Sequence, residues 1–281
     1  MSNPPKAAIT GWPVTYSRSP LVHGHWLKKY GLEGDYGRRD VDPETAEDFY
    51  RNFKDSGLVG CNVTVPHKEL AASVCAELDP AAEAMGAANT LWIDDSGKLC
   101  GANTDGIGFL GNLDQLAPGW DDNPGTAIVL GAGGAARAVI WSLLSRKFET
   151  VHIFNRTAEK AMEMAEKFGS STIGHSWDEL GDYIGKADLL INTTSLGMKG
   201  KAPLEIDLGP LPESALVSDI VYVPMKTDLL KKAEARGNRT VDGLGMLLHQ
   251  AVPAFERWFG MRPEVDEELR AMMIADLEKD G

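Results

Sequence analysis

The residues best suited to chemistry form a glycine-rich turn, Gly131-Ala132-Gly133-Gly134, between two segments of contrasting composition. The β-branched run Thr126–Leu130 predicts a strand, and the alanine-rich segment Ala135–Leu144 predicts a helix. Gly131 permits a tight turn and Gly133 lets the backbone approach a pyrophosphate, while N–H groups at a helix start favour an anion. This pattern predicts a dinucleotide-binding unit; a turn that only connects strand to helix is the alternative.

A second strand, Val151–Phe154, follows at the expected distance and ends in Asn155-Arg156-Thr157 rather than in an acid. An acidic residue there would accept hydrogen bonds from the ribose of NAD and repel the extra phosphate of NADP. Arg156 instead offers a planar, charged fork suited to phosphate. Thr157 adds a hydroxyl and a helix N-cap, and Lys160 adds a second cation. We therefore expect NADP in preference to NAD.

Two serines flank the start of a predicted helix near the N-terminus. Ser19 is a fitting N-cap with Pro20 at the first helical position, and Ser17 lies two residues before it. Together they place hydroxyls and backbone donors where a carboxylate could bind. Ordinary loop serines are the alternative.

Lys68 follows the predicted strand Val59–Val65, which Pro66 ends, and opens the next helix. The carboxyl end of a strand in an α/β layer is where ligands usually bind. A helix N-terminus is also a poor place for a structural cation, so a functional lysine is favoured. We expect His67 to be a solvent-facing neighbour.

Further polar residues stand at strand ends. Asn89, Asn103 and Asp105 form a cluster denser than turns alone require, although Asp105 could simply cap the following helix. In the nucleotide-binding half, two buried strands end near residues 192–195 and 219–222, where the nicotinamide half of a cofactor should reach. Gln250 is expected on a helix, where a surface glutamine is the default interpretation.

Composition excludes several classes of protein. The chain has 281 residues, 25% of them charged, and a net charge of -13, which argues against nucleic acid or an anionic membrane as partner. The three cysteines have no metal-ligand spacing and are expected to be free thiols, and no metal is expected. No apolar run could span a bilayer and no signal-peptide core is present, so a soluble cytoplasmic protein is expected.

The order of elements predicts an α/β fold with two domains. A three-layer αβα substrate domain with a mainly parallel sheet is expected over residues 1–106 and 244–281. A Rossmann-type, doubly wound domain is expected over residues 107–243. A helix after Met246 should be kinked by Pro253, and a final helix over 265–279 should return to the first domain.

Seven blocks, in this order, resemble the NADP-dependent shikimate dehydrogenase family, and the resemblance runs through nearly the whole chain. The blocks are Ser17–His23, Asn62–Lys68, Gly86–Leu91, Asn103–Gly106, Asn192–Met198, Asp219–Tyr222, and Asp242–Leu247 with Gln250. Two positions qualify the resemblance. Tyr16 stands where the family commonly has His, and Ser19 stands where Thr would favour quinate.

The resemblance implies NADPH-dependent reduction of 3-dehydroshikimate to shikimate in aromatic amino acid biosynthesis. Lys68 and Asp105 would be catalytic, with Lys68 donating the proton. The implied substrate-binding residues are Ser17, Ser19, Thr64, Lys68, Asn89, Asp105, Tyr222 and Gln250. The expected NADP-binding residues are Gly131, Ala132, Gly133, Gly134, Ala135, Asn155, Arg156, Thr157, Lys160, Ile220 and Gly243.

Three alternatives stay open at this point. One is a quinate/shikimate dehydrogenase that uses NAD, and another is a non-catalytic paralogue that senses shikimate or a nucleotide. The third is a different two-domain dehydrogenase, such as a methylenetetrahydrofolate enzyme, against which the Ser17/Ser19 loop argues. The expected partner is the small-molecule substrate alone, and the expected state is a monomer or a homodimer.

Overall fold

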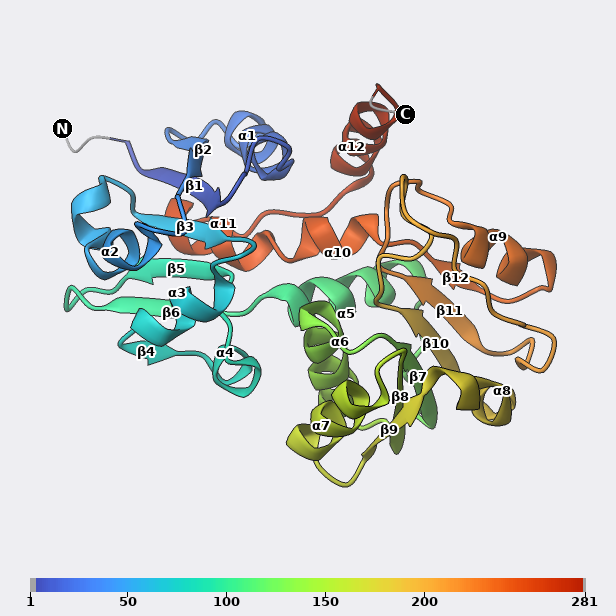
Figure 1. Ribbon diagram of the computed structural model, residues 1–281. Coiled ribbons are helices and arrows are strands. Elements are labelled where there is room, and N and C mark those ends of the chain that lie inside the picture. The colour runs from blue at the N-terminus through green and yellow to red at the C-terminus, as the bar shows by residue number, and fades with distance from the viewer. Residues whose placement is uncertain (1–3, 280–281) are drawn as a thin grey trace. The chain divides into compact units, whose positions relative to one another are not determined.

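The computed structural model describes residues 4–279 as two compact units, each built on a six-stranded sheet (Figure 1). Of the described residues, unit 1 comprises 4–104 and 250–275, and unit 2 comprises 105–249 and 276–279. Within the described part of the chain, no helix has both the length and the apolar character that a bilayer crossing requires.

The sheet of unit 1 has the strand order β2-β1-β3-β5-β6-β4. Strand β1 pairs in parallel with β2 and β3, whereas β5 runs antiparallel to both β3 and β6. The start of β5 therefore lies at the same edge of the sheet as the ends of β1 and β3. The strands are β1 (Lys6–Gly11), β2 (Asp35–Asp40), β3 (Gly60–Val63), β4 (Glu77–Leu78), β5 (Thr90–Ile93) and β6 (Leu99–Ala102).

Helices cover both faces of this sheet, which confirms the predicted three layers. On one face, Ile9 of β1 packs with Trp258 of α11 (Val252–Phe259). On the other, Cys61 and Val63 of β3 pack with Tyr50. The remaining helices are α1 (Ser19–Lys29), α2 (Ala46–Arg51), α3 (Lys68–Val74) and α4 (Pro80–Met85), with a 3-10 turn at Phe53–Ser56.

The sheet of unit 2 is entirely parallel, with the order β12-β11-β10-β7-β8-β9. Its two halves diverge from β7 and β10, and ligands of doubly wound sheets bind at that switch point, beyond the carboxyl ends of the strands. The strands are β7 (Thr126–Leu130), β8 (Thr150–Asn155), β9 (Thr172–Ser176), β10 (Leu189–Asn192), β11 (Leu216–Asp219) and β12 (Thr240–Val241). The predicted doubly wound fold is confirmed.

Both faces of this sheet are buried, because alternate residues of β7 enter different cores. Val129 joins a core with Phe109 and Ile140, whereas Leu130 joins one with Leu180 and Leu229. The helices that supply these cores are α5 (Asp105–Leu116), α6 (Gly134–Ser145), α7 (Ala158–Phe168), α8 (Leu180–Tyr183), α9 (Asp228–Ala235) and α10 (Leu244–His249), with 3-10 turns at Trp177–Glu179 and Ile184–Lys186.

The C-terminal region differs from expectation in one respect. Pro253 does not kink a continuous helix; it stands in the first turn of α11, and the helix is interrupted after His249. Proline is favoured at that position because the first-turn N–H has no partner within the helix. The division between the two units falls inside the last helix, α12 (Glu267–Lys279), between Ala275 and Asp276.

The compact units also divide the chain at different residues from the predicted domains. Helices α5 and α10 lie in the same unit and are close neighbours, so the compact units change at Asp105 and Gln250. The predicted functional domain bounds at 107 and 244 stay a prediction. The predicted outer limits, residues 1 and 281, lie outside the described residues. The functional assignment of each domain stays a prediction.

Candidate active site

One edge of the unit 1 sheet collects most of the polar residues singled out from the sequence. Thr10 pairs with Val63 across β1 and β3, and Thr90 pairs with both Asn62 and Ala102. The segments that adjoin these strand ends therefore meet at one edge. They are residues 12–18, residues 64–68, Asn89 and residues 103–104.

The paired serines form a compact group of hydroxyls. Ser17 Oγ lies 3.3 Å from Ser19 Oγ and also accepts the backbone N–H of Ser19 at 3.3 Å. Arg38 of β2 holds the loop by donating from Nη2 to the Ser17 carbonyl at 2.6 Å. The predicted N-cap is corrected by one residue: Arg18 is the cap and Ser19 is the first residue of α1. No acidic residue occupies the first turn of α1, so this helix start favours an anion.

Thr64 and Lys68 come from the connection between β3 and α3. The Thr64 N–H donates to the Thr10 carbonyl at 2.9 Å, which anchors the segment to β1. Lys68 is half-buried and is the first residue of α3, and its carbonyl accepts the N–H of Ala88 at 2.9 Å. The backbone therefore ties the lysine to the segment that carries Asn89.

The expectation that His67 faces solvent is wrong. Only 2% of the residue is exposed, and its Nε2 lies 2.7 Å from the Val41 carbonyl, to which it donates. Burial of the imidazole is tolerated because that hydrogen bond satisfies it. Nothing in the local sequence pattern signals this partner, which is 26 residues away.

Asn89 is the centre of a buried polar group. Its Oδ1 accepts the Thr104 N–H at 2.9 Å and the Thr90 hydroxyl at 3.0 Å, and its Nδ2 donates to Gln250 Oε1 at 3.2 Å. Gln250 is not on a helix surface; it is half-buried in the turn between α10 and α11. Asn103 has a structural role. Its side-chain amide donates to the Ala87 carbonyl at 2.9 Å and so joins the loop at residue 103 to the loop at residue 87.

In unit 2, the glycine turn after β7 is tightly packed at its first glycine and open at the next two. Gly131 adopts a φ of +108°, and a Cβ there would lie 2.9 Å from Thr193 Oγ1. At Gly133 and Gly134, in contrast, an added Cβ would meet nothing within 4 Å. Gly133 is the N-cap of α6 and supplies no side-chain cap, so the first N–H groups of α6 receive no hydrogen bond from a capping side chain.

The loop after β8 carries the predicted phosphate-binding cation. Arg156 is exposed. On either side of it, the side-chain amide of Asn155 donates to the Thr157 carbonyl at 2.9 Å, and this hydrogen bond closes the loop that carries Arg156. Thr157 occupies the N-cap position of α7, but its side chain makes no capping hydrogen bond, which corrects that part of the expectation. Lys160 is exposed in the first turn of α7.

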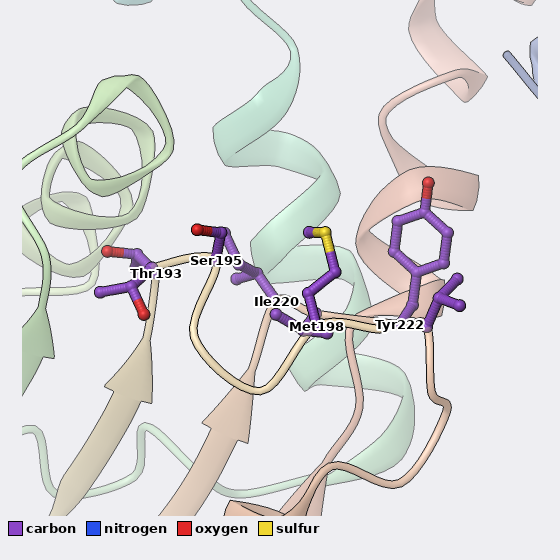
Figure 2. Close-up of a pocket in the computed structure, with 8 residues that line it drawn as sticks. Thr193, Ser195, Met198, Ile220 and Tyr222 are labelled. Atoms are coloured by element: carbon purple, nitrogen blue, oxygen red, sulfur yellow. The ribbon is translucent and has the colours of Figure 1, made fainter. Parts of the chain in front are cut away.

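A pocket of about 290 Å³ opens beyond the ends of β10 and β11 (Figure 2). Ile220 and Tyr222, both singled out from the sequence, line it, and Figure 2 shows the side chains of Met198 and Tyr222 pointing to the same side of the strand ends. The full lining is Thr193, Thr194, Ser195, Met198, Ile220, Val221, Tyr222 and Val223. The predicted Gly243 packs beneath it, since a Cβ there would lie 2.2 Å from the Ile220 carbonyl oxygen.

Asp219, at the end of β11, is a fully buried carboxylate that stabilises the strand ends around this pocket. Burial raises the pKa of its carboxyl, and three donors oppose that shift. They are Thr227 Oγ1 at 2.7 Å, Asn192 Nδ2 at 2.9 Å and the Val221 N–H at 3.0 Å. These bonds join β10, β11 and α9, so the strand ends that form the pocket are held rigidly.

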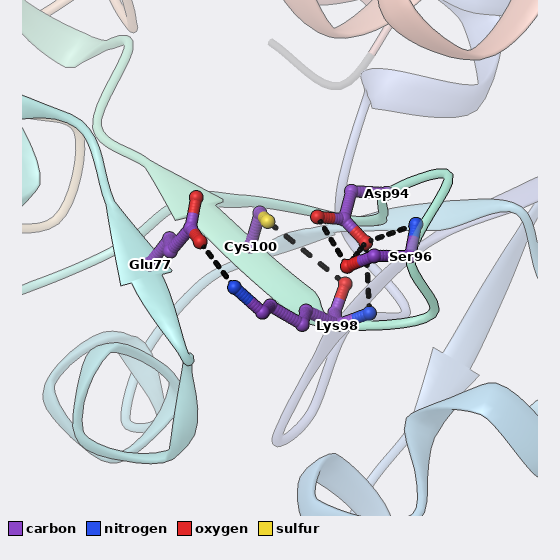
Figure 3. A network of polar contacts seen from close by, with 5 residues as sticks. All are labelled: Glu77, Asp94, Ser96, Lys98 and Cys100. Carbon is purple, nitrogen blue, oxygen red and sulfur yellow. Dashed lines mark hydrogen bonds and ion pairs between the residues drawn. The ribbon is translucent and has the colours of Figure 1, made fainter.

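A second polar cluster lies elsewhere in unit 1, on the β5–β6 hairpin and β4 (Figure 3). Ligand atoms of Glu77, Asp94 and Cys100 lie within 4.8 Å of one another, as in some metal sites. Lys98 Nζ already pairs with Glu77 at 2.7 Å, and Asp94 accepts the Ser96 and Lys98 N–H groups of the hairpin turn. The turn and the ion pair account for the cluster, so we assign no ion to it.

The predicted site residues are thus divided between the units. Unit 1 carries Ser17, Ser19, Thr64, Lys68, Asn89 and Gln250, whereas unit 2 carries Asp105, Tyr222 and the predicted nucleotide-binding residues. Contacts join the two serines to each other and Asn89 to Gln250. Sequence reasoning missed the buried partners Tyr36, Asn62, Thr90 and Thr104, although Asn62, Thr90 and Thr104 lie inside blocks that the sequence had singled out.

Comparison with known proteins shows the family to which the sequence is related. Residues 9–91 match the family profile of the shikimate dehydrogenase substrate binding domain, residues 120–198 that of shikimate / quinate 5-dehydrogenase, and residues 243–273 that of the shikimate 5'-dehydrogenase C-terminal domain. A shikimate dehydrogenase (NADP(+)) of Azorhizobium caulinodans is 56% identical over 276 residues, covering 98% of each chain.

Solved structures are similar over the same length. The shikimate 5-dehydrogenase of Listeria monocytogenes, in complex with shikimate and NAD, has a TM-score of 0.88 and 30% identity, and the match covers 97% of each chain. The quinate dehydrogenase of Corynebacterium glutamicum, in complex with NAD, has a TM-score of 0.87 and 28% identity, and the match covers 98% of this chain and all of that one.

Proposed function

Because this chain belongs to the shikimate dehydrogenase family, we propose that it catalyses the reversible, NADPH-dependent reduction of 3-dehydroshikimate to shikimate. The observation that carries the proposal is the polar edge of the unit 1 sheet. There a pair of serine hydroxyls, a half-buried lysine and an asparagine–glutamine amide pair adjoin the ends of neighbouring strands. Such a set suits a small ring acid that carries a carboxylate, hydroxyls and a ketone.

Each group of this edge has a proposed part in binding. Ser17 and Ser19 hold the carboxylate, helped by the N-terminus of α1. Thr64, Asn89 and Gln250 hold ring hydroxyls. Tyr222, which lines the pocket of unit 2, is also a proposed substrate-binding residue. An analogue that lacks a hydroxyl would leave a buried polar group unpaired, at a cost of about 1–3 kcal/mol each.

Lys68 and Asp105 are the proposed catalytic residues. Reduction of the ketone places negative charge on its oxygen, and the Lys68 ammonium would donate a proton there. General acid catalysis of this kind contributes about 10²–10⁴-fold to the rate. Asp105, the first residue of α5, is the proposed second member of the proton-handling pair.

The residues of unit 2 fit NADP. The open space over Gly133 and Gly134 at the start of α6 suits the pyrophosphate, and the exposed Arg156 suits the 2′-phosphate. Ala132 and Ala135 complete the turn, and Asn155, Thr157 and Lys160 flank Arg156. NADPH, when bound, supplies the hydride that reduces the ketone carbon.

The direct test is a spectrophotometric assay at about 340 nm (the absorbance of the reduced nicotinamide), with shikimate and NADP⁺ as substrates. Quinate and NAD⁺, in all four combinations, form the comparison set. We expect the highest kcat/KM with shikimate and NADP⁺. A preference for quinate with NAD⁺ would instead support a quinate dehydrogenase, and binding without turnover would support a sensor. The cytoplasmic location and the monomeric or homodimeric state stay predictions.

A further inference from the structure

Five side chains of unit 1 form one continuous chain of hydrogen bonds behind the polar edge. Tyr36 Oη donates to Asn62 Oδ1 at 2.6 Å, and Asn62 Nδ2 donates to Thr90 Oγ1 at 3.2 Å. The Thr90 hydroxyl donates to Asn89 Oδ1 at 3.0 Å, and Asn89 Nδ2 donates to Gln250 Oε1 at 3.2 Å. The first four side chains are at most 6% exposed, so water does not compete for these bonds.

Backbone groups fix the direction of this chain at two places. Asn62 Nδ2 also donates to the Asn89 carbonyl at 3.2 Å, and a carbonyl can only accept. Asn89 Oδ1 also accepts the Thr104 N–H at 2.9 Å, and an N–H can only donate. Neither asparagine amide can therefore be flipped without setting two donors or two acceptors against each other.

The two ends of the chain are held as well. The Tyr36 ring stacks on the His23 ring with centroids 3.9 Å apart and planes 4° apart, which keeps the phenol hydroxyl on Asn62. At the other end, the Thr104 hydroxyl donates to the Gln250 carbonyl at 2.8 Å. The side-chain amide of Gln250 is oriented by Asn89: because Asn89 Nδ2 points to it as a donor, Gln250 must present its oxygen Oε1.

We propose that Thr90, supported by Asn62 and Tyr36, is a positioning residue that locks the Asn89–Gln250 pair as hydrogen-bond donors toward the substrate. This inference rests on the proposed function, in which Asn89 and Gln250 hold ring hydroxyls. The pair then recognises a ring oxygen by its lone pairs. A substrate analogue that presents an ammonium group in place of that hydroxyl should be rejected, because its donors would face donors.

The test compares Thr90→Val with Thr90→Ser in the full-length enzyme. Valine keeps the shape of threonine but cannot donate to Asn89, whereas serine keeps the hydroxyl. Since one hydrogen bond is lost, we expect Thr90→Val to raise the KM for shikimate about three- to tenfold. The KM for NADP⁺ should not change. The control Thr90→Ser, which keeps the hydroxyl, should leave the KM for shikimate near the wild-type value. Tyr36→Phe, which leaves Asn62 Oδ1 without its hydroxyl donor, should shift the KM in the same direction.

A double-mutant cycle separates positioning from general packing. In an Asn89→Ala background, Thr90→Val should raise the KM for shikimate no further, because Thr90 acts through Asn89. Additive effects, or equal effects of Thr90→Val and Thr90→Ser, would overturn the inference. If Thr90→Val does not fold, Thr90→Ala, which also removes the hydroxyl that donates to Asn89, decides by the same cycle. Failure of the wild-type protein to oxidise shikimate would overturn the proposed function itself.

Discussion

Acidification should destabilise unit 1 through His23, and the size of the effect follows from what surrounds this side chain. His23 lies on α1 with no exposed surface, between Tyr36 and the rings of Phe255 and Trp258, whose centroids lie 5.8 Å away. Burial lowers the pKa of His23 from 6.5 to about 3, and the Asn62 side chain opposes this shift. Neither ring nitrogen makes a hydrogen bond of normal geometry to any described residue.

The sign of the pH effect follows from which state binds the proton. The unfolded chain protonates His23 near pH 6.5, whereas the folded chain does so only near pH 3. Between these values the unfolded state binds more protons, so the free energy of unfolding falls as the pH falls. The contribution of His23 is complete above pH 6.5 and is lost by pH 3. Linkage predicts a loss of about 3 kcal/mol between pH 7 and pH 4, and about 5 kcal/mol in total.

The assay is urea unfolding of the wild type and of His23→Phe at several pH values from 7 to 4. Phenylalanine has a similar shape but does not titrate, so the variant should lose about 3 kcal/mol less than the wild type over this range. Other groups, including His152 with a pKa lowered to about 4 mainly by burial, titrate in both proteins and cancel. The ring resonances of His23 should also show a neutral imidazole down to pH 4. A His23 that titrates near pH 6.5, or equal slopes for the two proteins, would refute the reasoning.

Three substitutions test other parts of the structure. Lys68→Ala should lower kcat by about 10²–10⁴-fold with a much smaller change in the KM for shikimate; near-normal turnover would exclude Lys68 as the proton donor. Arg156→Ala should raise the KM for NADP⁺ about 10- to 100-fold and that for NAD⁺ far less, because a charge-assisted phosphate contact is lost. An equal loss for both cofactors would contradict the phosphate role. Gly60→Ala should lower Tm by destabilising the fold about 1–3 kcal/mol, since its Cβ would lie 1.8 Å from Trp258 Nε1. An unchanged Tm would show that the contact relaxes at no cost.

The nucleotide-binding half could be predicted from the sequence because its signals are local. A β-branched run, the turn at 131–134 and an alanine-rich helix follow one another within about 20 residues, and each signal depends only on its neighbours. Doubly wound sheets then assemble these units in a standard order, and the observed order agrees. Strand β2, in contrast, was not predicted, because its sequence Asp35–Asp40 is mostly polar and exposed.

The sequence by itself determined the fold class, the family and the residue types available for chemistry. Only the tertiary structure decided how these residues are partnered. Tyr36 meets Asn62 because β2 and β3 flank β1, and Asn62 meets Asn89 because β5 runs antiparallel to β3. The Asn89–Gln250 hydrogen bond joins residues 161 positions apart. Hydrogen bonds over such separations depend on strand order and direction, which no local pattern of residues encodes, so the orientation of each amide could be known only from the folded chain.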